Sequence, residues 1–131
     1  MKVIHTSGKR KRAIARATLS PGKGIVRMNN QRLESFGDHV LQLRINEPLV
    51  LIGDKAKQVD IDVHVRGGGS NGQAEAARLA IARALVEHDS KLKKLFEEYD
   101  RLLLVADVRR KEPRKPGRHS KARAKTQKSY R

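Results

Sequence analysis

Three glycines, Gly67, Gly69 and Gly72, follow the spacing G-x-G-x-x-G in the stretch VRGGGSNGQAEAARLA. In dinucleotide-binding proteins this spacing holds a pyrophosphate against amide groups at the start of a helix. Such a site also needs a second strand about 20 residues later, ending in an acidic residue that holds the ribose. Glu87 and Asp89 occupy that stretch, but the pattern there predicts the end of a helix. We therefore interpret the glycines as a tight strand-to-helix turn whose amides could still meet a phosphate.

Catalytic and metal-binding groups are otherwise scarce. Asp60, Asp62 and His64 alternate along one predicted strand, but one strand supplies a flat row of ligands and not a closed shell, so we expect a solvated or ion-paired face. The chain has no cysteine, which excludes disulfides and thiolate zinc sites. The remaining serines, histidines and carboxylates form no catalytic constellation that we can identify. We expect no metal, no cofactor and no enzymatic activity; a nucleotide-dependent enzyme remains the alternative.

Charge is the strongest signal in the sequence. The 131 residues include 30 Lys and Arg against 14 Asp and Glu, for a net charge of +16. Residues 109–131 hold 11 of those basic residues, one acidic residue and no Leu, Ile, Val, Phe or Met. Such a segment cannot bury enough apolar surface to fold alone. We therefore predict a globular body over residues 1–108 and an extended basic tail over residues 109–131 that orders on a partner.

The excess of cations predicts a polyanionic partner. Two Phe, two Tyr and no Trp make a base-stacking platform improbable, which favours structured RNA or unspecific DNA over single strands. A DNA-compacting protein and a nuclear-targeting segment remain alternatives. No apolar run approaches the length of a membrane span and the first residues lack a signal-peptide core, so we expect a cytoplasmic chain with no membrane contact.

Hydrophobic periodicity predicts an α/β body. Residues 11–19 and 24–28 are predicted strands joined as a hairpin through S-P-G, and residues 59–65 alternate as a half-buried strand. Residues 36–52 are a predicted helix interrupted at Pro48. Residues 71–86 are a predicted helix with Ala77, Ile81, Ala84 and Leu85 on its core side. The small residues of this helix should let it pack close to a sheet. The spacing of Ser70 and Gln73 predicts a capping box at its start. A short helix over residues 90–99 and a buried strand over residues 101–108 follow.

The motifs in order resemble the family of small-subunit ribosomal protein nine. The matching stretches are S-G-K-R-K-R-A-I-A-R-A, S-P-G-K-G with V-R-M-N-N, E-P-L, G-G-G-S-N-G-Q-A with A-R-L-A-I-A-R-A-L, and the tail from D-V-R-R-K-E-P-R-K-P-G-R to K-S-Y-R. They cover nearly the whole chain. The MKVIHTSGKRKR start and the RINEPLVLIG segment are more similar to the archaeal and eukaryotic branch than to the bacterial one.

The resemblance implies an α+β fold with a mixed four-stranded sheet packed by helices, a left-handed βαβ crossover and an extended basic tail. It also implies a place in the head of the small subunit, with ribosomal RNA, peptidyl-site tRNA and neighbouring ribosomal proteins as partners. Together with the basic clusters it indicates as rRNA-binding residues Lys9, Arg10, Lys11, Arg12, Arg16, Gly67, Gly68, Gly69, Arg109, Arg110, Lys111, Arg114, Lys115, Arg118, Lys121, Arg123 and Lys125.

The end of the tail is the part that the family places against tRNA. The resemblance assigns contact with the anticodon stem-loop of peptidyl-site tRNA to Lys128, Ser129, Tyr130 and Arg131. Bacterial relatives commonly have Phe before the serine and Lys before the final Arg, where this chain has Lys128 and Tyr130. Tyr130 either stacks on a base or ribose, or only fills space.

Overall fold

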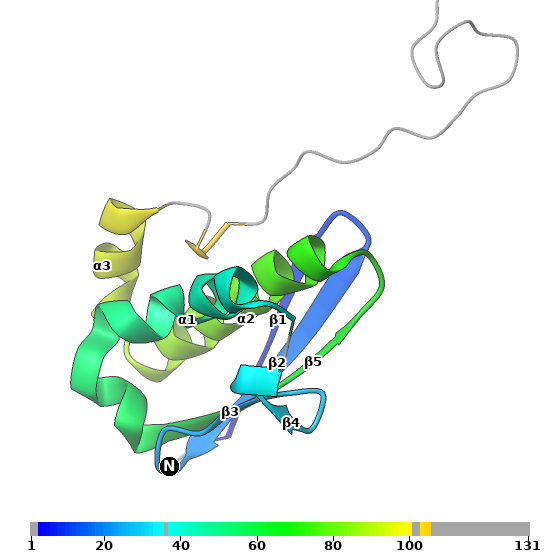
Figure 1. The fold of residues 1–131 in the computed structure, drawn as a ribbon. Coiled ribbons are helices and arrows are strands. Elements are labelled where there is room, and N and C mark those ends of the chain that lie inside the picture. The colour runs from blue at the N-terminus through cyan, green and yellow to red at the C-terminus, as the bar shows by residue number, and fades with distance from the viewer. Residues whose placement is uncertain (1–2, 36, 101–102, 106–131) are drawn as a thin grey trace, which may run out of the picture.

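The computed structural model describes residues 3–35, 37–100 and 103–105. Its strands form one mixed sheet in the order β1-β2-β5-β3-β4 (Figure 1). The β1–β2 and β2–β5 pairs are antiparallel, β3 runs parallel to β5, and β4 pairs antiparallel with β3. The strands are β1 (Ile4–Arg10), β2 (Ala13–Pro21), β3 (Val26–Met28), β4 (Gln31–Arg32) and β5 (Val59–Arg66).

The helices lie together on one side of this sheet. Helix α2 (Ser70–His88) packs on β1, β2 and β5, and α1 (His39–Ile52) packs beside α2 on the same side (Figure 1). Helix α3 (Leu92–Tyr99) contacts both, and short 3-10 turns span Leu33–Ser35 and Gly53–Gln58. Strand residues therefore alternate: Val59, Ile61, Val63 and Val65 of β5 are buried under the helices, whereas the residues between them face outward.

The contact between α2 and β1 depends on small residues. A Cβ atom on Gly8 would lie 2.2 Å from the carbonyl oxygen of Ala76 and 2.7 Å from the amide nitrogen of Ala80, so only glycine fits there. The Thr6 hydroxyl donates a hydrogen bond of 2.8 Å to the carbonyl of Ala80. The prediction that small residues let this helix pack close to the sheet is confirmed.

The predicted hairpin between residues 11–19 and 24–28 is wrong. Strand β2 pairs with β1 on one side and β5 on the other, and β3 pairs with β5 and β4. The true hairpin is β1–β2, closed by a turn at Lys11 (φ 53°) and Arg12. After β2 the chain passes the N-terminal end of β5, where the amide of Gly22 donates to the carbonyl of Gln58, and β3 then pairs with the other side of β5.

Three local predictions also need correction. Helix α1 is not interrupted at Pro48 but continues through it to Ile52. The proline ring is buried in the interior of the body, which stabilises this arrangement. The N-cap of α2 is Gly69, and the Gln73 side chain donates to the carbonyl of Gly67, so the predicted capping box does not form. Residues 103–105 form a turn in which the Leu103 amide donates to Asp100, and not a strand; residues 101, 102 and 106–108 of that prediction lie outside the described residues.

The predicted α+β class is confirmed, with a mixed sheet of five strands where four were expected. Residues 4–10 and the two-residue β4 add two strands, and the described residues 103–105 add none. The helices over 71–86 and 90–99 and the strand over 59–65 lie where they were predicted. The β3–α1–β5 connection is the parallel crossover, and its left-handed sense stays a prediction. In the part of the chain that the structure describes, no helix is both long and apolar enough to cross a bilayer.

Candidate nucleic-acid interface

The β1–β2 turn and the glycine turn meet at one end of the sheet. Gly67 has φ 77°, and a Cβ atom there would lie 2.6 Å from the carbonyl oxygen of Arg12. The glycine turn therefore packs directly against the basic turn, as the interpretation of a tight turn with close backbone packing predicts. Because the backbone at Arg12 occupies the space beside Gly67, this arrangement gives no support to a dinucleotide site. It places Lys11 and Arg12, both exposed, next to the start of α2.

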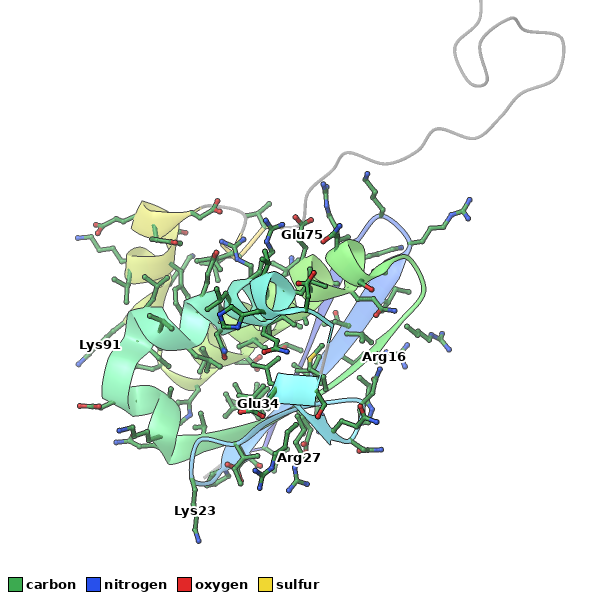
Figure 2. All side chains as sticks on the ribbon, viewed as in Figure 1. Arg16, Lys23, Arg27, Glu34, Glu75 and Lys91 are labelled. Atoms are coloured by element: carbon green, nitrogen blue, oxygen red, sulfur yellow. The ribbon has the colours of Figure 1, made fainter. Side chains whose placement is uncertain are left out.

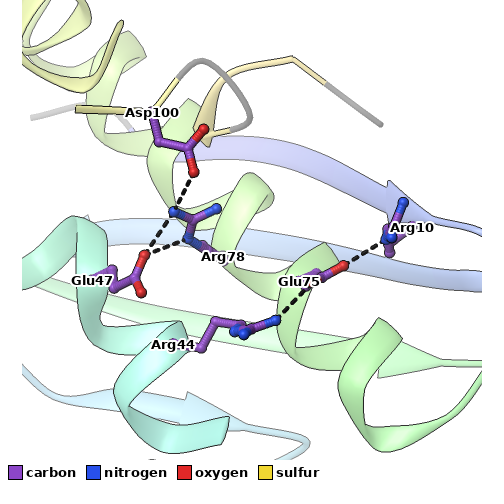
Figure 3. Close-up of polar contacts among 6 residues, drawn as sticks. All are labelled: Arg10, Arg44, Glu47, Glu75, Arg78 and Asp100. Atoms are coloured by element: carbon purple, nitrogen blue, oxygen red, sulfur yellow. Dashed lines mark hydrogen bonds and ion pairs between the residues drawn. The ribbon is translucent and has the colours of Figure 1, made fainter. Parts of the chain in front are cut away.

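Arg10 differs from its neighbours in this basic run. Its side chain is only 15% exposed and forms an ion pair with Glu75 of α2 (Figure 3). Lys9, Lys11 and Arg12 are exposed, and among the described residues their side chains have no hydrogen-bond or ion-pair partner. The cations available to a ligand at this end are therefore Lys9, Lys11 and Arg12, whereas Arg10 holds β1 to α2.

Among the residues that the structure describes, the arginines on the helix side of the sheet are engaged by the protein itself. Arg44 of α1 joins the Glu75 pair at 2.7 Å, and Arg78 of α2 bonds Glu47 at 2.6 Å and Asp100 at 3.1 Å (Figure 3). These groups line a cleft together with Tyr99. Because its arginines are matched by carboxylates, the cleft is poorly suited to an anion.

Arg83 makes a separate contact on the same side. It donates to the Ser7 carbonyl in β1 at 2.9 Å and to the Leu104 carbonyl at 3.1 Å. Both acceptors are backbone groups, so this arginine fastens the last described segment to the sheet.

The outer face of the sheet carries free arginines. Arg16 of β2 and Arg66 of β5 are exposed on this face, as are Arg27 of β3 and Arg32 of β4. Within the described residues none of these side chains has a hydrogen bond or ion pair. Figure 2 shows Arg16 and Arg27 on the sheet side and Glu75 on the helix side. The fold thus separates free arginines from paired ones.

Asp60, on the same face, is committed to the backbone. Its carboxylate accepts hydrogen bonds from the amides of Lys23, Gly24 and Ile25 at 2.9, 3.1 and 3.0 Å. These bonds, that from Ile25 foremost, lower the pKa of Asp60 below its ordinary value of 3.8. The interaction holds the β2–β3 loop against β5 and presents Lys23 at the edge of the sheet (Figure 2). Asp60 is therefore structural, and among the described residues no cluster of His, Asp and Glu could hold a metal.

Sequence reasoning found some of these residues and missed others. It identified Lys9, Lys11, Arg12, Arg16 and the glycine turn, and the fold places them at one end and on one face. It missed Arg66, which the alternation of β5 could have placed on the wet face. It missed Arg27 and Arg32 because no local pattern shows that β3 lies beside β5. The predicted tail residues, from Arg109 to Arg131, lie outside the described residues.

A small α+β body with exposed, unpaired arginines on one face and at one end is typical of a protein that binds the phosphate backbone of a nucleic acid. The family described as ribosomal protein S9/S16 matches residues 8–131 of the chain. Curated relatives named small ribosomal subunit protein uS9 include that of Thermoplasma acidophilum, 55% identical over 96% of this chain and 98% of its own length. That of Methanococcus vannielii is 48% identical over the full length of both chains.

The chain therefore belongs to the ribosomal protein S9/S16 family, a family of structural ribosomal proteins. This finding confirms the resemblance drawn from the sequence, including its archaeal character, since both relatives are archaeal.

Proposed function

We propose that the chain is a structural, non-enzymatic constituent of the small ribosomal subunit in the cytoplasm and binds ribosomal RNA in the head of that subunit. Family membership supports the place in the ribosome. The observation that carries RNA binding is the separation of arginines: those on the helix side are paired within the protein, whereas those on the sheet side and in the β1–β2 turn are free among the described residues. Free, exposed guanidinium groups bind phosphate with paired hydrogen bonds.

The body contacts RNA through the end of the sheet where the two turns meet. Lys9, Lys11 and Arg12 neutralise phosphates there, and Arg16 extends the contact onto β2. The adjoining glycine turn, formed by Gly67, Gly68 and Gly69, lies close to the basic turn, so its amides can contact the same RNA phosphate backbone. Arg10, also assigned to this contact, holds β1 to α2 through its ion pair with Glu75 and so fixes the position of the neighbouring cations.

The tail adds affinity through charge. Its eleven basic residues fold on binding, because RNA phosphates neutralise cations that otherwise repel one another, and each contact releases counterions. The residues assigned to this contact are Arg109, Arg110, Lys111, Arg114, Lys115, Arg118, Lys121, Arg123 and Lys125. Neighbouring ribosomal proteins of the head pack on other surfaces of the body.

The tip of the tail meets the anticodon stem-loop of peptidyl-site tRNA. Lys128 and Arg131 supply positive charge, with Ser129 and Tyr130 beside them. Deleting residues 128–131 is expected to leave incorporation into the subunit unchanged and to weaken tRNA binding in the peptidyl site by several-fold, measured by filter binding to reconstituted subunits. Unchanged tRNA affinity would remove the tip from this role.

Competition binding tests the RNA proposal. The full chain is titrated with head-domain ribosomal RNA and with duplex DNA of equal length between 50 and 200 mM salt. If about 6–10 phosphates are contacted, affinity falls on the order of 10³ to 10⁵ over this range, and RNA stays preferred throughout. Equal affinity for DNA at physiological salt would overturn the proposal and favour a DNA-compacting protein.

A further inference from the structure

We propose that the RNA-binding surface continues across the outer face of the sheet, which holds the backbone of a double-helical RNA at two separate clusters of cations. The inference rests on the proposed function and extends it beyond the two turns and the tail. The first cluster is Lys9, Arg16 and Arg66, and we call it the Arg16 cluster. The second is Lys23, Arg27 and Arg32, and we call it the Arg27 cluster. All six side chains are exposed.

The strand register builds the Arg16 cluster. Ile14 of β2 lies opposite Lys9 on one side and Arg66 on the other, and Arg16 lies opposite His64. Arg16 is therefore the diagonal neighbour of both Lys9 and Arg66, about 7–8 Å away across the strands. Ile14 is partly buried between them. Three cations thus surround one apolar side chain on a flat surface, which suits the backbone of an extended polyanion.

The Arg27 cluster contains a pairing that is unfavourable in the free protein. Asn29 and Asn30, with φ of 53° and 66°, turn the chain from β3 into β4, and the register places Arg27 directly opposite Arg32. Like charges opposite one another in adjacent strands are destabilising. Asp62 of β5 lies beside Arg27, and Asp60 also interacts electrostatically with Arg27, but no ion pair forms among Arg27, Arg32 and Asp62. A phosphate bound here would relieve the repulsion.

The distance between the clusters calls for a ligand with more than one phosphate. Arg66 and Asp62, which mark the two clusters on β5, are four residues apart, or about 13 Å along the strand. One phosphate cannot bridge that span, whereas an RNA backbone presents several phosphates over it. His64 is the outward-facing residue of β5 between these two markers, whereas Asp60, committed to the loop amides, lies beyond Asp62 at the Arg27 cluster. The exposed cations of the face therefore lie in two separate groups.

The outer face lacks the large aromatic rings on which single strands are usually stacked, and of the side chains with an aromatic ring it exposes only His5 and His64 among the described residues. Of the described aromatic residues, Phe96 is buried and Tyr99 lines the cleft on the helix side, so no Phe or Tyr lies on the outer face among the residues that the structure describes. Proteins that bind single strands through a sheet stack bases on such residues. Recognition here runs through phosphate charge and helix shape.

The experiment compares two charge-matched double variants of the full chain. Arg27→Gln with Arg32→Gln removes two cations from the Arg27 cluster, and Lys93→Gln with Lys94→Gln removes two exposed cations from α3, on the helix side. Affinity for a head-domain RNA duplex is measured as a function of salt. We expect the arginine variant to bind at least fivefold more weakly than the lysine variant and to lower the salt slope by about two. Thermal unfolding of the arginine variant should not fall, because the opposed charges are removed.

Each outcome decides between the claims. Equal losses in the two variants, with head RNA still preferred to DNA by the wild-type chain, would overturn this inference alone. A loss confined to single-stranded RNA would overturn the double-helical ligand. Absence of any RNA preference in the wild-type chain would overturn the proposed function itself.

Discussion

Substitution of Gly8 by alanine probes the closest contact in the fold. The added Cβ atom would lie 2.2 Å from a carbonyl oxygen and 2.7 Å from an amide nitrogen of α2, and both belong to backbone that cannot rotate away. Relief requires β1 and α2 to separate by about 1 Å along their main interface. Overpacking of this kind costs about 1–3 kcal/mol, and rigid neighbours place Gly8→Ala at the upper end. In a body of roughly 100 residues, a loss of about 3 kcal/mol lowers Tm by at least ~12 °C.

Gly72→Ala is the matched control for this prediction. Its added Cβ would meet Ala13 at 3.5 Å and the carbonyl oxygen of Arg10 at 3.7 Å, which are ordinary contacts. Alanine also favours helix over glycine by up to about 1 kcal/mol, so Tm should stay the same or rise. Thermal melts followed by circular dichroism give the Tm of both variants, and urea titrations give their free energies of unfolding. A change of less than about 1 kcal/mol for Gly8→Ala would refute the close approach of α2 to β1.

Two further predictions concern polar groups. Asp60 has a lowered pKa, so its contribution to stability is present above pH 3.8 and lost as the pH falls through the lower, folded-state value. Asp60→Asn should therefore lower the free energy of unfolding by on the order of 1 kcal/mol at pH 7. Urea titrations of both proteins should show this difference shrinking below about pH 4. A difference that stays constant down to pH 2 would contradict the role of the ionised carboxylate. Arg78, 12% exposed, joins Glu47 to Asp100 by ion pairs. Arg78→Gln should therefore lower the free energy of unfolding by about 2 kcal/mol. The loss is smaller than for a fully buried ion pair because both carboxylates can be hydrated again. In a double-mutant cycle with Glu47→Gln, additivity would show that the pair contributes nothing.

The elements with strong local periodicity were predictable. In β5 and α2 the spacing of apolar and small residues shows which side of the element is buried. The presence of this strand and this helix, and the side that each turns to the core, could therefore be predicted from the sequence. The strand order could not be predicted in this way, because β3 reaches its place through contacts that lie far apart in sequence, such as the Asp60 carboxylate with the amide of Ile25. Proximity along the chain favoured a β2–β3 hairpin, and tertiary contacts overrode it.

The candidate site shows the same division. Charge density drew attention to the run G-K-R-K-R, but it could not separate an arginine that is paired within the protein from one that is exposed without a partner. Arg10 is paired because Glu75, 65 residues later, lies across the interface with α2. The two arginines at 27 and 32 come together only through the Asn29 and Asn30 turn, whose positive φ values determine which side chains share a face.

Directed cleavage in the assembled subunit tests most directly the claim that the sheet side faces RNA. The chain has no cysteine, so single cysteines can carry an iron chelate that generates hydroxyl radicals. Ser7→Cys places the probe on the outer face of β1, and Ser90→Cys places it at an exposed position between α2 and α3. We expect strong ribosomal RNA cleavage from position 7 and little from position 90. Cleavage from position 90 that equals or exceeds that from position 7 would contradict the assignment of the sheet side to RNA.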